Sequence, residues 1–262
     1  MRRDDNTQDE RLARAEFYDA SWDRWQDMIR YSPAPRLRRE KALGWLREHR
    51  PATVLDVGCG NGELLSEVQR VLPGARLTGA DISPAVVAAN AARFPGMAFA
   101  VMNLDEDAQA PMERHDAVVC MEVVEHCLDP EAALERLAAL TGHVLVLSVP
   151  CGPLFALDRQ VGHTLHFAPA DIVPLLERAG LRVELAQRWG FPFFNLYKHA
   201  INLRPQAMAE AFLSDKPYSA GQKLLASAAL AAFRLCLPWW GYQLFVVARR
   251  KTSGKASAGT TK

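Results

Sequence analysis

Apolar residues in the middle of this chain occur as short continuous runs, separated by stretches in which apolar residues recur every three or four positions. Seven runs have the length of buried strands, at residues 54–57, 77–81, 98–103, 116–121, 143–150, 181–188 and 241–249. The intervening stretches 63–72 and 172–179 show the 3.6-residue period of helices. Strands that alternate with helices predict an α/β fold with a mostly parallel, doubly wound sheet and right-handed crossovers.

The rest of the chain flanks this core. We expect an N-terminal helical cap at 1–50, a core at 51–191, a helical insertion or lid at 192–240 and a final core strand at 241–250. The tail at 251–262 consists mainly of Ser, Gly, Thr, Ala and Lys, so we predict that it is disordered.

The first predicted strand ends in three glycines, Gly58, Gly60 and Gly62. Glycines at a strand-to-helix turn let the backbone reach positive φ and approach a ligand closely, and the following helix N-terminus offers free N–H groups. The third glycine comes one position too early for the dinucleotide fingerprint, and Glu63 stands where a P-loop has lysine. Asp56, before the first glycine, suits an ammonium group better than a pyrophosphate.

The spacing of Asp56, Gly58, Gly60 and Gly62 resembles the first motif of the class I S-adenosylmethionine-dependent methyltransferases. This resemblance implies a Rossmann-like seven-stranded sheet whose last strand is antiparallel. It also implies that Asp81 binds the ribose hydroxyls, that Ile82 contacts the adenine, and that Asn103, or Asp105 as a rival, accepts from the adenine amine. The implied cofactor contacts are Asp56, Gly58, Cys59, Gly60, Gly62, Asp81, Ile82, Asn103, Leu104 and Met121.

A second group of chemically active residues follows the fourth predicted strand. If residues 122–126 form one helical turn, Glu122, Glu125 and His126 project from one face. Such a group is either a metal site or an acid/base cluster. His163, with His166 as its substitute, lies in a loop after the fifth strand that is expected at the same sheet edge.

This Glu-x-x-Glu-His element resembles the ubiquinone-pathway O-methyltransferases and the small-RNA 3′-terminal 2′-O-methyltransferases. By that resemblance Glu122, Glu125, His126 and His163 bind Mg²⁺, or Zn²⁺, Mn²⁺ or Fe²⁺. The alternative is that the glutamates are structural and that His126 or His163 is a catalytic base without a metal. The resemblance covers about residues 50 to 190, and neither flanking region matches.

Composition narrows the choice of partners. The net charge of +1 gives no electrostatic case for nucleic acid, and the one basic run, at 36–41, is typical of the solvated face of a helix. Five cysteines without metal-ligand spacing and a charged N-terminus without a signal peptide favour the cytoplasm. The apolar stretch at 221–240 is expected to pack on the sheet, with a substrate lid, a dimer surface and a peripheral membrane contact as alternatives.

These features predict a methyltransferase that acts on a small-molecule acceptor, by O-methylation of a hydroxyl with or without a divalent metal. The alternatives are a metal-independent N- or C-methyltransferase of natural-product or lipid-linked metabolism, and a catalytically silent S-adenosylmethionine-binding protein. The sequence does not indicate which acceptor is used or which oligomer forms.

Overall fold

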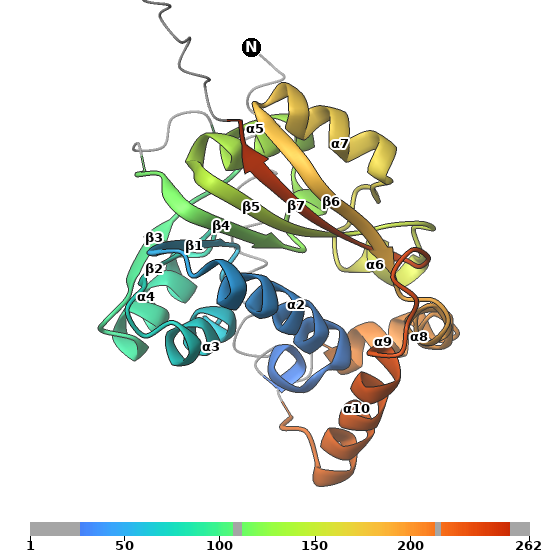
Figure 1. The fold of residues 1–262 in the computed structure, drawn as a ribbon. Coiled ribbons are helices and arrows are strands. Elements are labelled where there is room, and N and C mark those ends of the chain that lie inside the picture. Colours follow the sequence, from blue (N-terminus) through green and yellow to red (C-terminus); the bar gives the residue numbers. More distant parts are fainter. Residues whose placement is uncertain (1–26, 107–111, 213–215, 252–262) are drawn as a thin grey trace, which may run out of the picture.

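The computed structural model describes residues 27–106, 112–212 and 216–251. One seven-stranded sheet lies at its centre, with the strands in the order β3-β2-β1-β4-β5-β7-β6 (Figure 1). All neighbouring strands are parallel except β7, which is antiparallel to both β5 and β6. The predicted sheet with an antiparallel last strand is therefore confirmed. The strands are β1 (Thr53–Val57), β2 (Arg76–Asp81), β3 (Ala98–Val101), β4 (His115–Met121), β5 (Thr141–Pro150), β6 (Leu181–Trp189) and β7 (Gln243–Arg250).

Helices cover both faces of the sheet. On one face lie α2 (Pro33–His49) and α3 (Glu63–Val71), and on the other lie α5 (Pro130–Leu140) and α7 (Pro169–Arg178) (Figure 1). The central strands β1, β4 and β5 are buried on both sides, which explains their continuous apolar runs. The other helices of the core are α4 (Pro84–Arg93), the 3₁₀ turn η1 (Val124–His126) and α6 (Ala156–Gln160).

Helix α4 begins where its local sequence predicts. Ser83 is the N-cap, and its Oγ accepts a hydrogen bond from the Val86 N–H at 3.1 Å. Pro84 occupies the first helical turn, where no N–H is needed. This cap fixes the end of β2 against the start of α4, and so fixes the position of Asp81 between them.

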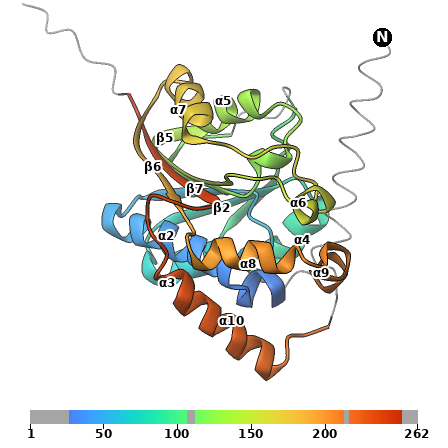
Figure 2. The same ribbon diagram turned by 90° about the vertical axis from the view of Figure 1, so that its right-hand side faces the viewer.

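The insertion between β6 and β7 is helical. It consists of α8 (Phe193–Ile201), α9 (Pro205–Phe212) and α10 (Ala220–Phe233). Helix α10 packs on α2 and α8 and projects from the body of the molecule (Figures 1 and 2). None of the described helices is long and apolar enough to cross a membrane. The helices predicted before residue 27 and the tail predicted to be disordered, from residue 252, lie outside the described residues.

Candidate active site

The turn after β1 has a backbone that requires glycine. Gly58, Gly60 and Gly62 have φ angles of 75°, 50° and 73°. The N–H groups of Gly58 and Cys59 both donate to the carbonyl of Ala80 in β2, at 2.8 and 3.0 Å. A Cβ atom on Gly58 would lie 2.2 Å from a methyl group of Val123, so the loop after β4 also packs tightly on this turn.

Asp81 connects this turn to the end of β2. Its Oδ2 accepts from the Gly60 N–H at 2.9 Å, and its Oδ1 accepts from the Ser83 N–H at 3.1 Å. The residue is only 4% exposed, yet it lines the cavity described next. The carboxylate is therefore held in one orientation by backbone donors on two elements.

A cavity of about 410 Å³ lies outside the carboxyl ends of β1 and β4, where the strand order reverses. Nine of the ten predicted cofactor residues line it: Asp56, Gly58, Cys59, Gly60, Asp81, Ile82, Asn103, Leu104 and Met121. Gly62 does not. It caps α3, and a Cβ atom there would lie 2.9 Å from the ring of Phe94, so this glycine serves the packing of α3 against α4.

Asp56 is a buried acid at this cavity. Burial, together with the charge of Asp81, raises the pKa of its carboxyl to about 7 against the opposing effect of Arg39. At neutral pH the carboxyl is therefore close to half protonated. A cation placed beside it would favour the ionised form.

Asn103 and Asp105, the two residues considered as acceptors for the adenine amine, both line the cavity. The Asn103 Oδ1 accepts from the Asp105 N–H at 3.0 Å, which forms a local turn. The Asp105 Oδ1 accepts from the Leu128 N–H at 2.8 Å and so ties this turn to the segment before α5.

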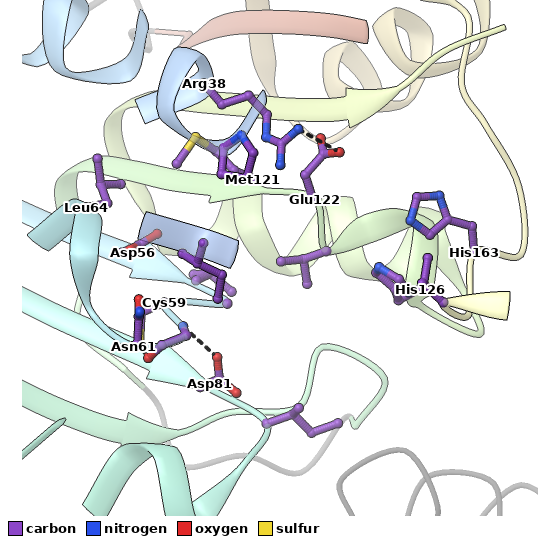
Figure 3. A pocket seen from close by; sticks show the side chains of 18 of the residues that line it. Arg38, Asp56, Cys59, Asn61, Leu64, Asp81, Met121, Glu122, His126 and His163 are labelled. Atoms are coloured by element: carbon purple, nitrogen blue, oxygen red, sulfur yellow. Dashed lines mark hydrogen bonds and ion pairs between the residues drawn. The ribbon is translucent and has the colours of Figure 1, made fainter. Parts of the chain in front are cut away.

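The predicted helical turn at 122–126 is wrong. Only Val124–His126 is helical, as a 3₁₀ turn, and Glu122 lies before it with a φ of 58°. The Glu122 carboxylate turns away and accepts from Ser148 Oγ at 3.1 Å and from Gln243 Nε2 at 2.5 Å. It also pairs with Arg38 at 3.4 Å (Figure 3). Glu122 is thus held by the sheet and by α2, outside the group that contains Glu125.

Three of the four predicted metal ligands do converge. Glu125, His126 and His163 offer ligand atoms that all lie within 4.8 Å of one another. Glu125 is fully buried, and neither carboxylate oxygen has a hydrogen-bond partner among the described residues. Burial, followed by the charge of Glu122, raises the pKa of Glu125 well above its usual value. An unpartnered buried carboxylate is costly, unless a proton or a cation neutralises it.

Hydrogen bonds to carbonyl groups set the tautomers of the histidines, because a carbonyl can only accept. His126 Nδ1 lies 3.2 Å from the Gly162 carbonyl, so Nδ1 carries the proton and Nε2 is the unprotonated nitrogen. His166 Nδ1 donates likewise to Gly152 at 3.3 Å, so its Nε2 accepts from His163 Nδ1 at 3.2 Å. His163 therefore also has an unprotonated Nε2. Burial, helped by the neighbouring charges of His126 and His166, lowers the pKa of His163 to about 2.

The two histidines lie at the opposite end of the cavity from Asp56, Cys59 and Asp81 (Figure 3). Their rings are edge to face, with centroids 4.7 Å apart. The loop that carries His163 is fixed to η1, because the N–H and the hydroxyl of Thr164 both donate to the Glu125 carbonyl. One cavity thus joins the glycine turn to the histidine pair.

Several charged lining residues were missed in the sequence, among them Arg38, Asp158 and Lys198. Arg38 belongs to the basic run that was predicted to be solvated, yet its side chain is 15% exposed and pairs with Glu122. Asp158 in α6 and Lys198 in α8 form an ion pair within the cavity wall. Lys198 follows Leu196 and Tyr197 in the insertion, and an isolated cation in that setting was a usable signal.

Residues 26–202 of this chain match the family described as methyltransferase domain. Ubiquinone biosynthesis O-methyltransferases from Aeromonas salmonicida (strain A449) and Acinetobacter baylyi (strain ATCC 33305 / BD413 / ADP1) are 27% and 28% identical to it over 220 and 222 residues. Each match covers 74% of this chain, and 91% and 90% of the two relatives.

Solved structures share the fold. Magnesium protoporphyrin IX methyltransferase from Synechocystis PCC 6803 with bound S-adenosylhomocysteine (SAH) has a TM-score of 0.51 to this chain at 18% identity. The match covers 81% of this chain and 82% of that one.

Proposed function

Since this chain belongs to the methyltransferase domain family, we propose that it transfers the methyl group of S-adenosylmethionine to a hydroxyl group of a small, largely apolar acceptor. The observation that carries this proposal is that one cavity contains both groups, with the glycine turn and Asp81 at one end and His126 and His163 at the other. A donor and an acceptor that bind at these two ends face each other across the cavity.

The donor end suits the cofactor chemically. The Asp81 carboxylate has the acceptor oxygens that ribose hydroxyls require, and Ile82 offers an apolar surface to the adenine. Asp56 lies where the glycine turn begins and offers a carboxyl to the ammonium of the methionine part. The glycine backbone lets the cofactor approach without side-chain obstruction.

Segments outside the sheet form much of the remaining wall of the cavity, and most of their lining side chains are apolar. These apolar lining residues are Met28, Ile29, Pro35, Leu157, Val161, Ile201 and Ala209. Arg38 and Lys198 add positive charge beside them, and each is paired with an acid. The curated relatives are named as O-methyltransferases of ubiquinone biosynthesis, which supports a hydroxyl as the acceptor.

For this reaction the protein needs to place the acceptor and to help remove the proton of its hydroxyl group. The sulfonium already activates the methyl group, so the cavity needs to align the acceptor oxygen with it. The hydroxyl must lose its proton during the transfer. His126 and His163 both present an unprotonated Nε2 at this end, so either can bind a cation. The low pKa of His163 makes it the weaker proton acceptor of the two.

We further propose that Glu125, His126 and His163 bind a divalent cation. Glu125 has two carboxylate oxygens without a hydrogen-bond partner in the described part of the chain, and the Nε2 atoms of His126 and His163 are unprotonated. These groups lie close enough together to bind one ion. A mixture of one carboxylate and two imidazoles favours Zn²⁺, Mn²⁺ or Fe²⁺ over Mg²⁺. When bound, the ion would lower the pKa of the acceptor hydroxyl.

An acceptor screen tests both proposals. The purified chain, with S-adenosylmethionine, is offered phenols and alcohols with and without long alkyl chains, and amines of matched size. We expect methylation of a hydroxyl acceptor, loss of turnover after exhaustive chelation and recovery on addition of a divalent ion. Turnover that survives chelation would contradict the metal proposal and leave a histidine base. Methylation of amines alone would contradict the choice of a hydroxyl.

The affinity for SAH is expected to rise with pH through about 7. The free protein holds Asp56 partly protonated, whereas the ammonium of SAH favours the carboxylate, so binding releases a proton. Affinity therefore falls as the pH drops below 7, by up to about tenfold per pH unit. Titration calorimetry from about pH 5.5 to about pH 7.5, a range around this pKa, measures the effect. In Asp56→Asn the slope should vanish, and an equal slope in that variant would contradict the assignment.

A further inference from the structure

Helix α6 connects the helical insertion to the loop that carries His163. It lies between β5 and that loop in the sequence, and it runs directly into the loop. In both views α6 lies beside the helices of the insertion, and it contacts α9 (Figures 1 and 2). Leu157 and Asp158 of α6 also line the cavity of the candidate active site. One short helix therefore touches the insertion, the cavity and the His163 loop.

The first link from the insertion to α6 is an ion pair. Lys198 Nζ in α8 pairs with Asp158 Oδ1, and the two side chains are 13% and 5% exposed. The same ammonium lies 5.6 Å from the centre of the Phe155 ring, at the start of α6. The other carboxylate oxygen of Asp158 accepts from the Phe155 N–H at 3.0 Å and so caps the helix. Loss of either partner of such a buried pair is costly, because the other charge then stays unpaired.

The second link is a hydrogen bond to the backbone of α6. Asn202, the C-cap of α8, accepts from the Leu157 N–H at 3.0 Å, and its own amide donates to the Lys198 carbonyl at 2.8 Å. The Leu157 N–H lies in the first turn of α6, where the helix itself offers no acceptor. Asn202 does not line the cavity of the candidate active site. Any effect of this residue on turnover must therefore pass through α6 or α8.

Asp158 extends this connection to the two histidines of the loop. Its backbone carbonyl accepts from the His163 N–H at 3.0 Å. Its Oδ2 lies 3.5 Å from His166 Nε2, and that nitrogen lies 3.2 Å from His163 Nδ1. Asp158 thus contacts the backbone of His163 and the ring of His166, while Lys198 holds its side chain.

The position of His163 depends on supports on both sides of it in the sequence. After it, Thr164 is bonded to the Glu125 carbonyl through its N–H and its hydroxyl. Before it, α6 supplies the Asp158 carbonyl. A misplacement of about 1 Å in a group that acts on the substrate can cost roughly 10²-fold in rate. A change in the support from α6 can therefore alter turnover without touching the donor end of the cavity.

We infer that Lys198 and Asn202 are positioning residues, through which the insertion holds α6 and thereby places His163 at the acceptor end of the cavity. This inference rests on the proposed methyl transfer, in which His163 acts on the acceptor oxygen. The charge of Lys198 is used by Asp158, so its role does not require contact with the acceptor. The insertion then has two roles, because it forms part of the cavity wall and also orients the group that acts on the acceptor.

Three variants of the full chain change the links in different ways. The double variant Lys198→Met/Asp158→Asn removes both charges together, so neither stays buried without its partner, and the new amide oxygen can still cap α6. Asn202→Ala removes the second link alone. Lys198→Arg retains the positive charge and should preserve the first link. The matched control is Arg204→Met, which removes an exposed positive charge of the same insertion outside the cavity lining.

Steady-state kinetics with the acceptor from the screen measure the effect. We expect kcat to fall about tenfold in the double variant and about threefold in Asn202→Ala, with unchanged KM for the acceptor and unchanged affinity for SAH. Lys198→Arg and the control should stay within about twofold of the unmodified chain. In a His163→Ala background the double substitution should cause a further loss of less than about twofold, because residues that act through one another are not additive.

Three kinetic results would overturn the inference. The first is an unchanged kcat in both the double variant and Asn202→Ala. The second is a raised KM with an unchanged kcat in the double variant, which would mean that Lys198 contacts the acceptor itself. The third is an equal loss of kcat with and without His163, which would mean that the links act elsewhere. If the double variant does not fold, Asn202→Ala alone and in the His163→Ala background supplies the same comparisons.

Nuclear magnetic resonance of the histidine rings separates this inference from the proposed function. Without cofactor or acceptor, the ring-nitrogen shifts of His163, assigned by their absence in His163→Ala, should change in the double variant and in Asn202→Ala. They should not change in Arg204→Met. Unchanged shifts in all variants would overturn the inference whether or not an acceptor is found. Changed shifts in a chain that methylates no acceptor would reject the proposed function and still support the placement of His163 by the insertion.

Discussion

Replacing Gly60 with valine is expected to abolish binding of SAH while the chain remains folded. Gly60 has a φ of 50° and lines the cavity, and its N–H and carbonyl are fixed by Asp81 and Asn90. A β-branched residue is strained at positive φ and would place two methyl groups in the space of the cofactor. The free variant relieves this strain by moving its turn, so restoring the bound backbone costs about 1–3 kcal/mol, which corresponds to a loss of up to roughly hundredfold before the steric overlap is counted.

Titration calorimetry measures this loss, with Gly74→Val as the control. Gly74 lies in a surface turn before β2, and a Cβ atom there would have no neighbour within 4 Å. The control should bind SAH as the unmodified chain does. Equal affinities for the Gly60 variant and the control would remove the glycine turn from the cofactor site.

Substitution of His163 by alanine is expected to reduce kcat by about 10²- to 10⁴-fold and to leave the affinity for SAH unchanged. His163 lies at the end of the cavity away from the glycine turn, and its Nε2 is the unprotonated nitrogen. Its removal takes away either a proton acceptor or one of the three groups around Glu125. Both roles concern the acceptor oxygen, so the donor end should be unaffected.

Steady-state kinetics with the acceptor from the screen, together with calorimetry, separates these effects. His143→Ala is the control, since His143 is exposed and lies at the start of β5. Glu125→Gln adds a second comparison because it keeps the shape of the side chain and removes the charge. The metal role would be contradicted if Glu125→Gln keeps both its turnover and its cation binding. A large loss of turnover in His163→Ala would then assign His163 as a base. Unchanged turnover in His163→Ala would exclude both roles.

The sheet was predictable from local patterns. The strands β1, β4 and β5 are buried on both faces, so each appears in the sequence as an uninterrupted apolar run, and Gly58 and Ser83 mark the turns that follow β1 and β2. The donor end of the site follows from the same signals. A glycine that needs positive φ and an acid at a strand end are properties of a few adjacent residues.

The acceptor end was predicted less well because distant residues determine it. Glu122 adopts a positive φ without being glycine, and the groups that hold it there are Ser148, Gln243 and Arg38. The sequence of residues 122–126 does not indicate that these residues are its partners. The structure therefore keeps Glu125, His126 and His163 together and separates Glu122 from them.

The sequence also predicted poorly which polar side chains face solvent and which are buried. The basic run at 36–41 was expected to face solvent, but Arg39 is 5% exposed and donates to Glu67 at 3.1 Å. His115, at the start of β4, is 3% exposed, and its Nε2 is hydrogen-bonded to Thr78 Oγ1 at 3.0 Å. In both cases a hydrogen-bond partner from another element offsets the cost of burial. The amphipathic periodicity of a helix or strand does not predict which distant residue will be that partner.

The two halves of the cavity have different architectural origins. The donor half comes from the carboxyl ends of β1 and β2, which cannot change without disturbing the sheet. The rest of the cavity wall comes from residues 28–39, from α6 and from α8 and α9, which lie outside the sheet. Exchange of these outer segments between homologues can therefore alter which molecule is methylated while methyl donation itself is preserved. Natural homologues can diverge in these outer segments while they keep the strand ends, and chimeras can be constructed by exchanging the same segments.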